Sequence, residues 1–148
     1  MDDKGFIVTL DALLSLIVVF ILLATVTNIS ADKSSTSMQD LTMAKNVHDT
    51  MELMANYKDI STNKTVIELM VEELEKSSNQ NSGVDNAGQI AGYFLNKTLT
   101  GNNYNLIEIN KLNGTTIASN ADVNQASNVS VASKSFGEYT FKLYIWNN

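Results

Sequence analysis

Residues 106–118 read LIEINKLNGTTIA, and this stretch indicates that the last third of the chain contains a β-hairpin. Apolar and β-branched residues run up to Asn113-Gly114 and continue after it. Asn-Gly between two such runs is the strongest short hairpin signal, because both central residues of a type I′ turn need a positive φ. We therefore expect two antiparallel strands joined at Asn113-Gly114.

Two segments after this hairpin predict further strands. Residues 128–135 alternate weakly, and residues 138–146, which read EYTFKLYIW, are rich in the aromatic and β-branched residues that favour strands. In the second segment, alternation divides the side chains between two faces. The face that we expect to pack on a helix carries Tyr139, Phe141, Leu143 and Ile145. The other face is either solvated or covered by a neighbouring subunit, and it carries Thr140, Lys142, Tyr144 and Trp146.

The region before the hairpin favours helices, since no Gly or Pro occurs between Gly5 and Gly83. Apolar residues at three- and four-residue spacing predict an amphipathic helix over residues 38–57. Its apolar stripe comprises Leu41, Ala44, Val47, Met51 and Met54. A second helix is expected to open at residues 62–64, a polar loop to cover residues 76–83, and a third helix to cover residues 85–99. Helices packed on the sheet would give an α+β head.

The composition argues against several classes of function. The net charge is −6 and the pI is about 4.6, whereas nucleic-acid binding needs a basic surface. No Cys is present, and the single histidine, His48, is interpreted as a surface residue and not a metal ligand. No phosphate-binding loop or hydrolase motif occurs, and the acidic residues at 68–75 fit a solvated helix face. We expect no enzyme activity, no cofactor, no metal and no nucleic-acid partner.

Residues 6–26 are almost wholly apolar. As a helix this run would be about 31 Å long, close to the hydrocarbon thickness of a bilayer. Three interpretations stand: a spanning helix, a cleaved secretory signal with residues 29–31 as its cleavage site, and a buried core helix. Asp2 and Asp3 argue against the secretory signal, whose first region is normally basic. The length and the all-round apolar character argue against a core helix, so we favour a spanning helix.

The first residues resemble a known family. Lys4-Gly5-Phe6, followed by TLDALL at residues 9–14, resembles the start of archaeal type IV pilin-like proteins. Those proteins begin with a short polar leader, which a prepilin peptidase removes after its final Gly, and an acidic residue follows early in the mature chain. The resemblance implies cleavage between Gly5 and Phe6, and it gives Asp11 the place of the acid. It departs from the pattern because the acid is sixth instead of fifth, and because the leader has one basic residue.

Asp11 therefore has two interpretations. A lone carboxylate in a spanning helix costs about 2.5–3.5 kcal/mol, so an assembling subunit could pair it with the free α-amine of Phe6 of a neighbour and so fix the register. That role is also what the resemblance implies. The alternative is that Asp11 lies in the headgroup region and is solvated there.

The sequence thus predicts three regions: a leader over residues 1–5, a transmembrane and assembly helix over residues 6–29, and an extracytoplasmic head over residues 30–148. The predicted fold class is α+β, with a long N-terminal hydrophobic helix followed by helices packed on a small antiparallel sheet. The expected function is that of a structural, pilin-like subunit of the cell membrane, single-pass with its head outside, and extracellular when assembled into a filament. The expected partners are further copies, other pilin-like subunits, prepilin peptidase and membrane lipid. The alternative is a single-pass membrane-anchored extracytoplasmic interaction module that does not polymerise.

Asn-x-Ser/Thr sequons permit N-glycosylation of an exposed head. The candidate acceptors are Asn63, Asn96, Asn113 and Asn128. A fifth sequon, at Asn28, lies too near the expected membrane to be a good acceptor.

Overall fold

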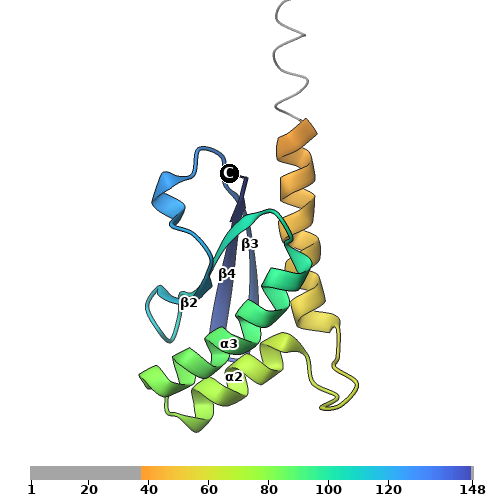
Figure 1. Ribbon diagram of the computed structural model, residues 1–148. Helices are drawn as coiled ribbons and strands as arrows, with labels where there is room; N and C mark the ends of the chain where they lie inside the picture. Colours follow the sequence, from red (N-terminus) through yellow and green to blue (C-terminus); the bar gives the residue numbers. More distant parts are fainter. Residues whose placement is uncertain (1–37, 148) are drawn as a thin grey trace, which may run out of the picture. The chain divides into compact units, whose positions relative to one another are not determined.

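The last third of the chain forms one antiparallel sheet in the computed structural model, which describes residues 38–147 (Figure 1). Its strands are β1 (Asn103–Glu108), β2 (Thr115–Ser119), β3 (Ser130–Phe136) and β4 (Tyr139–Trp146). They lie in the order β2-β1-β4-β3, and every neighbouring pair is antiparallel. The predicted hairpin and the two predicted C-terminal strands are confirmed. β4 is central, whereas β2 and β3 are the edges.

The two faces of β4 differ in burial as its alternation predicted. Tyr139, Phe141, Leu143 and Ile145 are all buried in the core. On the other face, Thr140, Lys142 and Tyr144 are half-buried. Trp146 is buried at the end of that face, where it adjoins residues 121–127 and the short 3₁₀ helix η1 (Val123–Gln125).

Three helices accompany the sheet. Residues 38–56 are helical, and α2 (Val66–Lys76) and α3 (Asn81–Thr98) follow. The start of α2 is fixed by a capping box, in which the Thr65 hydroxyl accepts the N–H of Glu68 at 3.2 Å and the Glu68 carboxylate accepts the N–H of Thr65 at 2.6 Å. The helix therefore begins at Val66 and not at residues 62–64.

The loop between α2 and α3 is shorter than the sequence predicts, because α3 already begins at Asn81. Gly83 allows this tight connection: a methyl group added there would lie 1.8 Å from the Oγ of Ser77. Asn79 has a positive φ of 62°, and its Oδ1 accepts the hydroxyl of Tyr139 at 2.8 Å. The α2–α3 connection is thereby fastened to the central strand.

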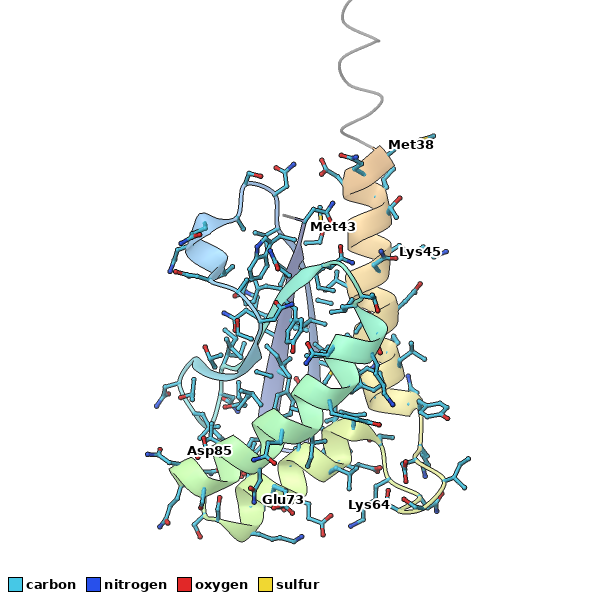
Figure 2. The ribbon with its side chains drawn as sticks, in the orientation of Figure 1. Met38, Met43, Lys45, Lys64, Glu73 and Asp85 are labelled. Carbon is cyan, nitrogen blue, oxygen red and sulfur yellow. The ribbon has the colours of Figure 1, made fainter. Side chains whose placement is uncertain are left out.

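The buried stripe of helix 38–56 is shifted from the predicted one. Val47, Met51 and Met54 are buried as expected, but Leu41 is 70% exposed and Ala44 is also exposed. Met43 takes the expected place of Leu41, and Figure 2 shows Met43 on the side of the helix opposite Lys45. The buried residues Met43, Val47, Met51 and Met54 are separated by four, four and three residues, so the predicted helical period is right, and only the residues assigned to the start of the stripe are wrong.

The predicted fold class requires a correction. Residues 38–147 form three helices and a four-stranded antiparallel sheet, so the described fold is α+β without the long hydrophobic helix of the prediction. No helix within residues 38–147 combines the length and the apolar character needed to cross a membrane. The physical reason is that each described helix keeps a polar, exposed face opposite its buried one. The predicted helix over residues 6–29 lies outside the described residues.

Candidate functional site

An apolar groove of about 470 Å³ lies on the surface of the described unit. It lies between the segment 57–65, α2 and α3. Its apolar lining comprises Tyr57, Val66, Leu69, Ile90, Tyr93 and Phe94. Two of the aromatic side chains in this lining are largely exposed: the exposed fraction is 59% for Tyr57 and 68% for Tyr93. Exposed aromatic rings around a hollow provide apolar area with a polar hydroxyl at each tip.

The helices position these side chains through their periodicity. The capping box that starts α2 places Val66 and Leu69, three residues apart, on the side that faces the groove. Ile90, Tyr93 and Phe94 have the corresponding spacing on α3, and the adjacent side of α3 is buried in the core. The groove is therefore built from partly buried and exposed residues at the margin of two helices that pack against each other.

The segment 57–65 closes one end of the groove with a compact turn. The Asp59 carboxylate accepts the N–H groups of Ser61 at 2.8 Å and of Thr62 at 3.1 Å, and it also accepts the Ser61 hydroxyl. These hydrogen bonds, led by that of the Ser61 hydroxyl, lower the pKa of Asp59 below its usual value. The turn leaves Ile60 96% exposed.

Charged groups at the groove already have partners. The Nζ of Lys64 lies 2.5 Å from Oε2 of Glu72, and the Nζ of Lys76 lies 3.2 Å from Oε1 of the same carboxylate. The hydrogen bond from Lys64 is the main cause that lowers the pKa of Glu72. Lys97 lies 4.3 Å above the Tyr93 ring, in cation–π contact. Figure 2 shows Lys64 on the segment that precedes α2.

This arrangement offers an apolar, aromatic surface for binding. Asp59 and Lys64, the ionisable side chains that line the groove with its tyrosines, are both held in local hydrogen bonds or ion pairs. Among residues 38–147, no three His, Cys, Asp or Glu side chains are grouped so that they could hold a metal ion.

Glu108 is a feature that the sequence analysis missed. Its side chain is 0% exposed at the end of β1, and its carboxylate accepts three backbone N–H groups. Oε1 accepts from Asn110 at 3.0 Å and from Thr140 at 2.8 Å, and Oε2 accepts from Leu112 at 2.6 Å. The carboxylate thus organises the β1–β2 loop and ties it to β4. The sequence contained a sign of this burial, because Glu108 lies on the same side of its strand as Tyr104 and Leu106.

The sequence-predicted residues do not converge on one site. Gly5, Phe6 and Asp11 lie outside the described residues. The four candidate acceptor asparagines of the head are all exposed but lie on different elements: Asn63 in the segment before α2, Asn96 on α3, Asn113 in the β1–β2 loop and Asn128 before β3. Asn96 is already engaged, because its Oδ1 accepts the Tyr104 hydroxyl at 3.0 Å. His48 is exposed, in agreement with its interpretation as a surface residue.

Comparison of the chain with protein-family models, with curated proteins and with solved structures gives no match. The proposals below therefore depend on the residues themselves.

Proposed function

We propose that the chain is a pilin-like structural subunit of the cell surface, held in the membrane by its apolar N-terminal segment and able to assemble through it. The observation that carries this proposal is the order of residues 4–26: Lys4-Gly5-Phe6, an apolar run, and Asp11 within that run. A prepilin peptidase would cut between Gly5 and Phe6. Asp11 would then pair with the new α-amine of a neighbouring subunit, since lipid makes an unpaired charge costly.

The described head is compatible with this role. Residues from Asp40 onward form one compact unit, and helix 38–56 buries Val47, Met51 and Met54 in the core of that unit. The chain therefore enters the head along a helix that the sheet and α2–α3 hold in place. A subunit of this kind presents a folded head at the end of its anchoring segment.

Mass spectrometry of the native N-terminus tests the proposal most directly. A mature chain that starts at Phe6 is the expected result. A start at Asp32 would show a secretory signal, and a start at Met1 would show an uncleaved chain; either result would contradict the proposal.

Variants of Asp11 test the assembly step. Asp11→Ala and Asp11→Asn should reach the membrane normally and give less filament, or fewer crosslinks between subunits, than the parent. Thr9→Ala, two residues away in the same run, is the matched control and should assemble normally. Normal assembly of both Asp11 variants would show that this residue is only solvated near the headgroups.

The groove favours a second candidate function, that of a membrane-anchored interaction module that does not polymerise. Its exposed Tyr57 and Tyr93 are typical of residues that contribute strongly to binding interfaces. Tyr93→Ala should then reduce binding of the protein to its target surface and leave filament formation unaffected. Leu41→Ala is a suitable control, because Leu41 is exposed to a similar degree, 70% against 68%, but lies away from the groove.

A further inference from the structure

We propose that the free edge of β3 pairs in antiparallel fashion with β3 of a second copy of this chain, so that two sheets join into one. The proposal rests on the backbone of β3 and does not depend on the N-terminal segment. An edge strand presents unpaired N–H and C=O groups, and these are a template for pairing with another chain.

The hydrogen-bond register shows which groups of β3 are free. β3 and β4 are joined by two residues, and Phe136 pairs with Tyr139. Thr140 directs its C=O toward β1, where the N–H of Ile109 donates to it at 2.9 Å. Odd-numbered residues of β4 therefore bond to β3, and their partners on β3 are the even-numbered ones. The backbone groups of Val131, Ser133 and Ser135 point away from the sheet, and no hydrogen bond within the described part of the chain uses them.

β3 lacks two of the features that protect an edge, short length and a bulge. It has seven residues, and its register with β4 is continuous, without a bulge. Val131 and Phe136 are 44% and 42% exposed. Its one charged side chain, Lys134, pairs with helix 38–56: its Nζ lies 2.7 Å from Oε1 of Glu52.

The opposite edge is protected. β2 has five residues, and its pairing with β1 shifts between Leu106 and Ile107. The backbone of α3 also lies against it: a methyl group added at Gly88 would be 2.5 Å from the carbonyl oxygen of Ile117. This contrast favours pairing of β3 with β3 over pairing of β3 with β2 of another copy.

Charge and overlap together select one register. Pairing centred on Ser133 places Ser133 opposite Ser133 of the second copy and Val131 opposite Ser135. All seven residues of β3 then overlap, and the outward groups exchange about six hydrogen bonds. Lys134 faces Ala132 in this register. A shift that centres the pair on Lys134 would instead place two lysines directly opposite each other, which is unfavourable.

The two-fold pairing reverses the second head. Helix 38–56 lies alongside β3 (Figure 1), so the N-terminal ends of the two copies of this helix would point in opposite directions. Subunits of one polar filament all point the same way. If the proposed function holds, this contact therefore joins heads of separate filaments or of separate surfaces, and not neighbours within one filament.

Single-cysteine variants test the register, because the chain contains no cysteine. In the purified full-length chain in detergent, Ser133→Cys places two thiols on opposed residues about 5.5 Å apart between Cα atoms, which a disulfide can bridge. Ser135→Cys is the matched control: it lies on the same strand and face, but its two copies would be about 14 Å apart. After mild oxidation, Ser133→Cys should give about tenfold more disulfide-linked dimer than Ser135→Cys.

A second pair of variants tests the backbone contact. Val131→Pro removes an outward N–H without breaking the ladder to β4, as edge strands permit. Combined with Ser133→Cys, it should lower the dimer yield severalfold, whereas Val131→Ala with Ser133→Cys should not. Emission of Trp146, the only tryptophan, reports whether each variant is folded.

Equal crosslinking at positions 133 and 135, or no crosslinking at 133 in a folded chain, would overturn the proposal. The second result would be expected if the edge receives an extended segment of another protein. Because this assay needs neither leader cleavage nor filaments, a negative result leaves the pilin proposal intact, and an uncleaved N-terminus leaves the β3 pairing intact. If Val131→Pro does not fold, the comparison of positions 133 and 135 decides the matter alone.

Discussion

β3 and β4 are joined by the two residues Gly137 and Glu138, whereas β1 and β2 are joined by residues 109–114. In the short connection, Gly137 has a φ of 58° and Glu138 has no positive φ, which is the pattern of a type II′ turn. In the long connection, Asn113 and Gly114 have φ values of 52° and 87°, and the N–H of Thr115 donates to the C=O of Leu112 at 3.1 Å. The predicted type I′ turn is thus present, but it is only the last part of a longer loop.

The two hairpins are closed by different kinds of contact. The β3–β4 hairpin closes through its own two turn residues, so its conformation is set by neighbouring residues alone. The β1–β2 loop also needs the Glu108 carboxylate, which accepts N–H groups from Asn110 and Leu112 within the loop and from Thr140 on β4. Its conformation therefore depends on a contact between residues that are 32 positions apart.

The largest effect is expected at β4, which pairs with β3 in its own hairpin and with β1 of the other hairpin. Phe141 is 0% exposed, so Phe141→Ala should lower the free energy of unfolding by about 3–5 kcal/mol through lost burial and a cavity. Phe136→Ala, on the partner strand, is the matched control, because Phe136 is 42% exposed and its loss should cost less than about 1 kcal/mol. Denaturant titration followed by Trp146 emission measures both. Equal midpoints for the two variants would show that β4 is not central to stability.

The next largest loss of stability is expected at Glu108, and it would show that the β1–β2 hairpin depends on a distant contact that the β3–β4 hairpin does not need. In Glu108→Gln, the amide nitrogen cannot accept a hydrogen bond, so at least one buried N–H of the loop is left without a partner. We expect a loss of about 2–3 kcal/mol in the free energy of unfolding. Glu138→Gln in the exposed turn removes only a surface ion pair with Lys111 and should cost less than about 1 kcal/mol. If Glu108→Gln and Glu138→Gln lower the free energy of unfolding by the same amount, the β1–β2 loop does not depend on Glu108.

A smaller effect is expected at the turn glycine of the short hairpin. Gly137→Ala places a side chain at positive φ and should cost about 1–2 kcal/mol. No atom would crowd an added methyl group, so the cost should come from the backbone alone. Gly137→Asn should recover part of it, because Asn tolerates positive φ better. An alanine variant as stable as the parent would indicate that this turn can change type.

The smallest effect is expected from pH, at the ion pair that connects β3 with helix 38–56. The hydrogen bond from Lys134, followed by that from Asn56, lowers the pKa of Glu52 below its usual value. A carboxyl group whose pKa is lowered by folding contributes stability above its unfolded pKa, and this contribution is lost as the pH falls through the folded pKa. Glu52→Gln should therefore lose less stability than the parent between about pH 5 and pH 3. Asp49→Asn, on the same helix but without a salt bridge among the described residues, is the control and should follow the parent.

Local patterns predicted much of the head because their causes are local. The period of two in residues 139–145 identified the buried face of β4, and Asn113-Gly114 identified the positive φ values of the turn. The errors arose where a boundary depended on a specific contact. The capping box Thr65-x-x-Glu68 was readable in the sequence and gives the true start of α2, whereas the early start of α3 depends on the close approach that Gly83 permits.

The candidate surfaces were less predictable, because they result from which elements lie next to one another. The sequence placed Tyr57, Leu69 and Tyr93 on separate segments, and only the packing of α2 beside α3 brings them to one groove. Leu41 fits the apolar period of its helix but is exposed, because burial depends on what lies opposite a residue as well as on its spacing.

Within residues 38–147, the sequence by itself determined the order of helices and strands, which face of β4 is apolar, and where the β1–β2 loop turns with a positive φ. These properties follow from the conformational preferences and the periodicity of neighbouring residues. Only the tertiary structure decided that β4 is central, that β3 is a free edge while α3 lies against β2, and that the Glu108 carboxylate is buried against three N–H groups. Strand order and burial are set by contacts between distant residues, and the free energy of those contacts depends on the whole arrangement of elements and not on any one segment.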